Sequence, residues 1–165
     1  MLELKKLSAA DGEDIYEMLQ EIPAEENGFM NSCRGKSFEE FKEWLEKCVE
    51  SSRRTEIIDG WRVPDTVFWL YDDGKPVGMG KVRHFLTDAL RAAGGNIGYA
   101  IRPTARCKGL GKALLGMLIK EARAIGVSEI LITVHEDNIA SLRVALANGG
   151  VVLKRENGRY YVNIE

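Results

Sequence analysis

The stretch that most constrains the fold is a strand, a basic turn with two glycines and a long helix, which follow one another between residues 96 and 125. Residues 96–101 are mostly apolar, and Pro103 keeps the residue before it extended, so the strand should end there. From 109 to 125, apolar residues recur at helical spacing. The first N–H groups of such a helix have no intrahelical acceptor and carry partial positive charge. The turn is therefore suited to binding an anion.

The rest of the chain predicts alternating strands and helices in one domain spanning residues 1–165. We expect further strands at 2–7, 67–71, 76–82, 129–134, 151–155 and 160–164, and helices starting near Ser8, Ser37 and Asn138. Ser8 with Asp11 and Ser37 with Glu40 resemble capping boxes, and residues 23–36 are expected to form a loop. Asp73-Gly74 and Asn157-Gly158 are typical hairpin turns. Gly98, inside a strand, indicates a bulge or a close backbone approach.

Composition excludes several classes of protein. The 165 residues are 45% hydrophobic and carry a formal net charge of -2, which fits a globular domain and not a protein that neutralises nucleic-acid phosphates broadly. No stretch approaches the ~18 apolar residues of a membrane span, and the first residues lack the apolar core of a signal peptide. The three cysteines are widely spaced and do not form a metal motif. We expect a cytoplasmic protein with reduced thiols and no metal, nucleic-acid or membrane partner.

The turn carries three cations and two glycines: Arg106, Lys108, Gly109, Gly111 and Lys112. Three positive charges suit a pyrophosphate better than a single carboxylate. Known nucleotide motifs do not fit, because the P-loop pattern is absent and Leu114 occupies the third glycine position of a dinucleotide fingerprint. Two glycines in a basic turn are, alone, more typical of an exposed turn. The assignment therefore depends on the surrounding motifs.

In that context the chain resembles the GNAT superfamily of N-acetyltransferases. Arg106-x-x-Gly109-x-Gly111 matches the Gln/Arg-x-x-Gly-x-Gly/Ala pattern of the family, and Asn138-x-x-Ser141 resembles the Asn-x-x-Ser that opens its next helix. The likeness is strongest over residues 94–150, and residues 94–99 are similar to a group of bacterial predicted acetyltransferases with unassigned substrates. The resemblance implies an α/β fold with a mixed, mostly antiparallel sheet of six to seven strands, about four flanking helices, and splayed fourth and fifth strands.

The resemblance also implies acetyl-CoA as co-substrate, bound between the splayed strands. The strand end would pair with pantetheine, a backbone N–H near Ile101 would meet the thioester carbonyl, and the turn would hold the pyrophosphate. The cofactor-binding residues implied are Ile101, Arg102, Arg106, Lys108, Gly109, Leu110, Gly111, Lys112, Asn138 and Ser141.

Direct transfer requires a neutral acceptor amine. For an amine with a pKa of ~10.4, the neutral form costs roughly 4.6 kcal/mol at neutral pH, so a base or ordered water should assist. The candidate catalytic residues are Glu136, His84 and Tyr99, with His135 beside Glu136. Each also has an ordinary structural interpretation, as a helix-dipole partner or a packed side chain.

The chain departs from the family pattern at the residue that usually acts as the general acid. Many members have a tyrosine seven residues after the capping asparagine, and here that position is Ala145. Tyr160 or Tyr161 could replace it, or no acid is needed. Cys107 has no evident base beside it and is not expected to act as a nucleophile.

Four functions remain open from the sequence. The first is acetylation of a small-molecule amine, and the second is acetylation of a protein N-terminus or lysine. The third is a non-catalytic acyl-CoA sensor, which Ala145 supports, and the fourth is a nucleotide-binding regulator. Glu25 and Glu26 could attract a cationic amine or could be solvated, and the terminal edge strands allow a homodimer.

Overall fold

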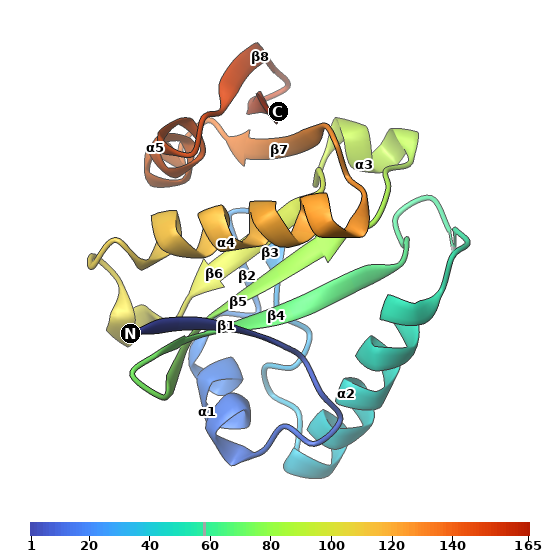
Figure 1. Cartoon of the computed structure of the whole chain (residues 1–165), viewed down its shortest axis with the longest axis vertical. Coiled ribbons are helices and arrows are strands. Elements are labelled where there is room, and N and C mark those ends of the chain that lie inside the picture. Colours follow the sequence, from blue (N-terminus) through green and yellow to red (C-terminus); the bar gives the residue numbers. More distant parts are fainter. Residues whose placement is uncertain (58) are drawn as a thin grey trace.

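Two sheets form the centre of the computed structural model, which describes residues 1–57 and 59–165 (Figure 1). Their strands are β1 (Leu2–Lys6), β4 (Asp65–Asp72), β5 (Lys75–Arg83), β6 (Ile97–Ile101), β7 (Ile130–His135), β8 (Val151–Glu156) and β9 (Arg159–Ile164). A short separate hairpin contains β2 (Glu25–Glu26) and β3 (Phe29–Met30). The helices are α1 (Glu13–Glu21), α2 (Phe38–Arg53), α3 (Asp88–Ala92), α4 (Leu110–Ile125) and α5 (Ile139–Ala147), with a 3-10 turn at Pro103–Ala105.

The two sheets meet along β6 and β7. The first sheet has the order β1-β4-β5-β6 and the second β7-β9-β8, and every neighbouring pair is antiparallel. In the described residues, one isolated bridge between Gly95 and Ile132 lies between the sheets, just before β6 begins. Beyond it a cleft separates β6 from β7. These are the fourth and fifth of the seven principal strands, so the expected fold with its splayed pair is confirmed.

Helices cover both faces of the first sheet. Figure 1 shows α1 and α2 on one side and α4 on the other. Phe41 and Trp69 are fully buried in the core under α1 and α2, and Leu115 and Leu118 are fully buried in the core under α4. A Cβ at Gly80 of β5 would lie 2.5 Å from Leu118 Cδ1, so α4 packs directly on glycine backbone there. At Gly78 a Cβ would lie 2.9 Å from Ile101 Cδ1 and 3.2 Å from Leu114 Cδ2, so the first turns of α4 pack beside the end of β6.

Local signals identified most of these elements correctly. The helix predicted at 109–125 is α4, and both predicted hairpin turns have positive φ at their two central residues. Ser37 and Glu40 form the reciprocal capping box expected of them. The pairing of β5 with β6 has no register shift at Gly98, so the bulge is absent there. The close approach is absent too, because the nearest group, the Phe29 ring, lies 3.4 Å from where a Cβ would lie, an ordinary contact.

The helix was expected to start near Ser8, but α1 begins at Glu13. The Ser8 N–H donates to the Asp11 carboxylate at 2.8 Å, as in a capping box, but the Trp69 indole N–H donates to the same carboxylate at 2.7 Å. Since that bond ties Asp11 to the sheet, Ser8 and Asp11 close a turn and the helix starts two residues later.

Two short elements were also missed by the sequence analysis. Residues 23–36 were expected to be a loop, yet they contain the β2–β3 hairpin, whose turn is Asn27-Gly28. Asn-Gly is the same turn signal that identified the hairpin at 157–158. The five-residue helix α3 begins after Thr87, whose hydroxyl accepts from the Leu90 N–H.

Candidate functional site

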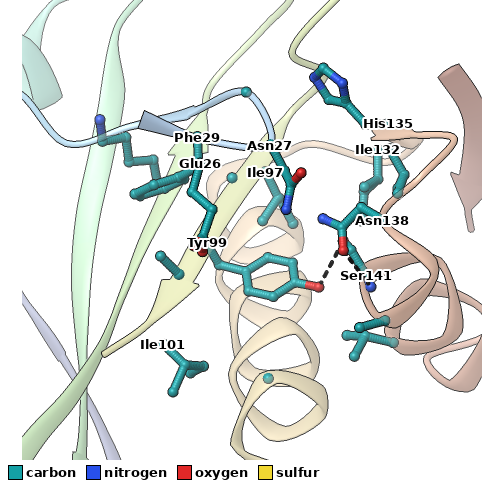
Figure 2. Close-up of a pocket in the computed structure, with 18 of the residues that line it drawn as sticks. Glu26, Asn27, Phe29, Ile97, Tyr99, Ile101, Ile132, His135, Asn138 and Ser141 are labelled. Atoms are coloured by element: carbon teal, nitrogen blue, oxygen red, sulfur yellow. Dashed lines mark hydrogen bonds between the residues drawn. The ribbon is translucent and has the colours of Figure 1, made fainter. Parts of the chain in front are cut away.

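A cleft of about 630 Å³ lies between the two sheets. β6 and β7 are each the edge strand of their sheet, so both present free backbone groups towards it. In Figure 2 the β2–β3 hairpin, with Glu26 and Phe29, lies opposite Asn138 and Ser141, and Tyr99 of β6 projects between them. One end of the cleft is formed by the turn that enters α4.

The turn presents unpaired N–H groups to the cleft. Gly109 is the N-cap of α4, with φ 75° and ψ 8°, a left-handed conformation that glycine adopts without a steric penalty. Within the described chain, the N–H groups of Leu110, Gly111 and Lys112 donate to no protein acceptor. All four residues line the cleft. Free donors and the positive end of the helix dipole make this turn a site for an anion.

Arg106 links this turn to the hairpin above it. Its guanidinium pairs with Glu26, with Nη2 to Oε1 at 2.7 Å, and Nε donates to the Ile101 carbonyl at 3.0 Å. Both side chains are partly exposed. An anion bound at the start of α4 would therefore compete with Glu26 for Arg106.

Two residues predicted to bind the cofactor lie elsewhere. Lys108 is exposed beside the turn and does not line the cleft. Arg102 also lies outside the lining, where its Nε donates to Glu21 at 2.8 Å and its Nη1 donates to the Pro76 carbonyl at 3.0 Å. Thr104 donates to the same Glu21 carboxylate. This network joins the end of α1 to the segment between β6 and α4.

We expect Arg102→Met to lower stability by about 2 kcal/mol, the usual cost of losing hydrogen bonds to a charged group, and to leave CoA affinity unchanged. Partial burial opposes ionisation of Glu21, but its hydrogen bonds with Arg102 and Thr104 outweigh burial and lower the pKa of the carboxyl. The stabilisation is therefore complete above the ordinary pKa of glutamate, about 4.3, and is lost as the pH falls through the lowered value. Urea unfolding at pH 7 and pH 3, with CoA titration, measures this. Loss of CoA affinity at unchanged stability would contradict it.

Tyr99 and the start of α5 meet across the cleft. The Tyr99 hydroxyl lies 3.1 Å from the Ser141 hydroxyl, and the Asn138 side chain accepts from the Ser141 N–H at 3.3 Å (Figure 2). Burial raises the pKa of Tyr99, while the hydrogen bond with Ser141 opposes that shift. Tyr99 therefore stays protonated to higher pH than an ordinary tyrosine. All three side chains, with that of Ile101, belong to the lining of the cleft.

The candidate bases lie in different surroundings. His135 lines the cleft, with its Nε2 3.5 Å from the Arg159 guanidinium. Glu136 is outside the lining and pairs with Arg155 at 2.9 Å. His84 is also outside it, with Nε2 2.8 Å from the Thr66 hydroxyl, and burial lowers its pKa. The structure thus brings Tyr99 and His135 together at one cleft and keeps the other two candidates apart from it.

The residue at the position of the usual tyrosine does not reach the cleft in this chain. Ala145 is fully buried in the core and does not line the cleft. Tyr161 is buried with its hydroxyl on the Ala92 carbonyl at 2.6 Å, and the ring of Tyr160 lies against the Arg155 guanidinium. Neither lines the cleft, so in the described chain Tyr99 is the one tyrosine that does.

The sequence analysis missed several lining residues. The hairpin brings Asn27 and Phe29 to the cleft beside Glu26, which the sequence had suggested as an acid near the acceptor, and the Asn27-Gly28 turn was the signal for the other two. Lys81 and Arg83 of β5 also line it. The sequence feature that could have identified them is the pair of positive charges at alternate positions of an otherwise apolar strand.

Residues 1–57 and 59–165 contain neither a membrane-spanning helix nor a metal-binding cluster. No helix there is long and apolar enough to span a bilayer. No group of three or more histidine, cysteine or acidic side chains there is arranged to hold a metal ion.

Comparison with known proteins identifies the family. The model of the acetyltransferase (GNAT) family matches residues 32–149. The fold is similar to that of N-acetyltransferase PseH of Campylobacter jejuni in complex with acetyl coenzyme A, at 16% identity over 100% of this chain and 99% of that one, with a TM-score of 0.62. It is also similar to yncA, a putative acetyltransferase from Salmonella typhimurium with its cofactor acetyl-CoA, at 19% identity over 99% and 93% of the chains, with a TM-score of 0.64. No curated protein matches the sequence. Because the family model covers most of its length, the chain belongs to the GNAT family of acetyltransferases.

Proposed function

We propose that this acyltransferase moves the acetyl group of acetyl-CoA to a primary amine of a small molecule, by direct attack in a ternary complex. The observation that carries the proposal is the set of free N–H groups at Leu110, Gly111 and Lys112, which line a cleft bounded by two unpaired strand edges. A pyrophosphate needs several donors at one point, and an extended pantetheine arm needs a free strand edge. Both requirements are met within one cleft.

The lining of the cleft suits acetyl-CoA. Arg106 and Lys112 add positive charge to the donors at the start of α4. A Cβ at Gly109 would meet no atom within 4 Å, which leaves open space over the turn. The edge of β6 that faces the cleft is available to pantetheine except at the Ile101 carbonyl, which accepts from Arg106, and Asn138 and Ser141 form part of the opposite wall. When bound, acetyl-CoA supplies an activated acetyl thioester.

Proton transfers are assigned to two residues of the cleft. The acceptor arrives as an ammonium ion and must lose a proton, and the ring of His135 is the candidate base that lines the cleft. Tyr99 carries a hydroxyl with a raised pKa, so it is protonated at neutral pH and can donate that proton to the departing thiolate. Ser141, hydrogen-bonded to Tyr99, orients the hydroxyl.

Thermal unfolding with ligands tests the proposal. A ligand at ~100 times its dissociation constant adds about 2.7 kcal/mol, which should raise the melting temperature of a chain of this size by roughly 5 to 10 °C. We expect this rise with acetyl-CoA and CoA and a much smaller one with ATP, followed by CoA release with an amine. An equal rise with ATP would favour a nucleotide site, and binding without CoA release from any amine would favour a sensor.

The homodimer stays a prediction, and β8 is the surface that supports it. β8 is an edge strand, and the side chains of Val151, Val152 and Leu153 are exposed. A second copy of the chain that paired with this edge would cover them. Sedimentation velocity should then give a dimer that Leu153→Asp dissociates, and a monomeric wild-type protein would contradict the prediction.

A further inference from the structure

The end of the cleft far from the α4 turn is lined by cations. We infer that the acceptor amine also carries an anionic group, such as a carboxylate, and that Lys81 and Arg83 bind that group. This inference rests on the proposed function and adds to it a class of substrate. We call this part of the cleft, lined by Lys81, Arg83, Gly94, Gly98 and Phe29, the acceptor end.

The register of the strands locates the acceptor end. Gly78 of β5 pairs with Ile101, where β6 enters the basic turn, whereas Lys81 pairs with Gly98 near the opposite end of β6. Ile101 lies four positions along β6 from Ile97, a distance of about 13 Å. The two cations are thus well separated from the turn assigned to the pyrophosphate.

Each of the two cations uses one donor within the protein and keeps others for a ligand. Lys81 faces Gly98 across the sheet, so no side chain of β6 covers its ammonium group. The Lys81 ammonium donates to the Met30 carbonyl at 2.9 Å and lies 5.3 Å from the centre of the Phe29 ring. Arg83 uses Nη1 to donate to the Gly95 carbonyl at 2.9 Å, and this leaves donors of its guanidinium free.

Neither cation has a carboxylate partner within 4.0 Å among the described residues. Asp65, opposite Arg83 on β4, interacts with both at longer range, and its carboxylate accepts from Ser51. Two positive charges therefore share one carboxylate. Burial lowers the pKa of Lys81, and the attraction of Asp65 only partly offsets this. Half-buried cations without ion pairs cost stability, which is typical of groups retained for a ligand.

The rest of the cleft also favours a negatively charged ligand. Arg159 lines the opposite wall beside His135. Glu26 is the only acidic residue in the described lining, and it is paired with Arg106. Glu25, the other acid considered for a cationic acceptor, accepts from the Gly28 N–H in the hairpin turn. No free carboxylate in the described lining is available to a polyamine.

Matched amines test the inference in a CoA-release assay. We would compare L-phenylalanine with phenylalaninamide and phenethylamine, and 4-aminobutanoate with butylamine. O-phosphoethanolamine with ethanolamine tests a phosphate in place of the carboxylate. We expect kcat/KM at least tenfold higher for the anionic member of at least one pair. If no pair favours its anionic member at least tenfold over the amine that lacks the anionic group, the inference is wrong.

Variants identify the residues responsible. Lys81→Met and Arg83→Gln should each lower kcat/KM for the preferred anionic amine at least tenfold, with little change for the paired amine that lacks the anionic group. Lys47→Met and Arg91→Gln, which replace exposed residues outside the cleft lining, are the matched controls and should change neither value. A uniform loss of kcat for all amines in Lys81→Met, with a shifted pH profile, would indicate a base and overturn the assignment.

A second readout does not depend on turnover. Succinate should raise the melting temperature of the wild-type protein above that in sodium chloride of equal ionic strength, and both cleft variants should lose this difference. Lys81→Met should melt at the same or a higher temperature than wild type without ligand, because it removes a half-buried charge that has no ion-pair partner. A lower melting temperature together with unchanged amine preference would mean that Lys81 is structural.

The two proposals fail in different ways. If acetyl-CoA does not stabilise the protein, the proposed function fails, whatever succinate does. If acetyl-CoA binds and amines release CoA without preference for anionic members, the proposed function stands and this inference is wrong.

Discussion

Replacement of Gly109 with valine is expected to raise the dissociation constant for CoA at least tenfold, about 1.4 kcal/mol, in a chain that still folds. Gly109 has φ 75°, and a β-branched residue held there costs about 1–3 kcal/mol. A Cβ at this position meets no protein atom within 4 Å, so the penalty arises in the backbone and not from a clash. Relief of that strain rotates the N–H groups of Leu110 and Gly111 away from the cleft.

Gly111→Ala is the matched control in the same turn. Gly111 lies inside α4, and an added Cβ would make ordinary contacts of 3.8 Å with Tyr99 and Val144. Alanine is a better helix former than glycine by up to about 1 kcal/mol, and the motif that this turn resembles accepts alanine at that position. The control should keep both stability and CoA affinity. Calorimetric titration with CoA, beside urea unfolding, separates the two effects, and unchanged affinity in Gly109→Val would refute the assignment.

The parts of the site that could be predicted from sequence are local. α4 and its turn depend on helical spacing, on two glycines and on the first N–H groups of the helix, all within about 20 residues. The cap of Asn138 on the Ser141 N–H likewise spans three residues. Such features follow from backbone geometry whatever the rest of the chain does.

The parts that could not be predicted depend on distant partners. Arg102 and Arg106 lie four residues apart in one basic segment, yet Arg102 pairs with Glu21 and Arg106 with Glu26. Only the fold decides that the first is turned away from the cleft while the second lines it. The same holds for Ala145, whose burial shows that a tyrosine could not reach the cleft from there without repacking.

The hairpin and the acceptor end are an intermediate case. The Asn27-Gly28 turn was visible in the sequence, but two-residue strands carry no alternation that could confirm it. Lys81 and Arg83 alternate with Gly80 and Val82 in β5, and that pattern also fits a solvent-exposed face. The register with β6, which sets Lys81 opposite Gly98, was needed to show that they line a cleft.

Tyr99→Phe is expected to lower kcat about 100-fold, the lower end of what general acid catalysis contributes, with little change in CoA affinity. The hydroxyl is the only tyrosine hydroxyl of the described chain that lines the cleft, and it is oriented by Ser141 at 3.1 Å. Tyr161→Phe is the matched control, because its hydroxyl bonds to the Ala92 carbonyl outside the cleft. That variant should lose about 1 kcal/mol of stability and keep its kcat.

The pH profile distinguishes an acid from a packing residue. Burial raises the pKa of Tyr99 above the ordinary value of 10, so the hydroxyl remains a proton donor throughout the neutral range, and the rate of the chemical step should fall only above pH 10. Ser141→Ala removes the hydrogen bond that lowers this pKa, so its alkaline limb should move to higher pH. Single-turnover rates between pH 7 and 11 measure the alkaline limb of the wild-type protein and that of Ser141→Ala. If Tyr99→Phe keeps the wild-type rate and the same alkaline limb, the thiolate leaves without help from Tyr99.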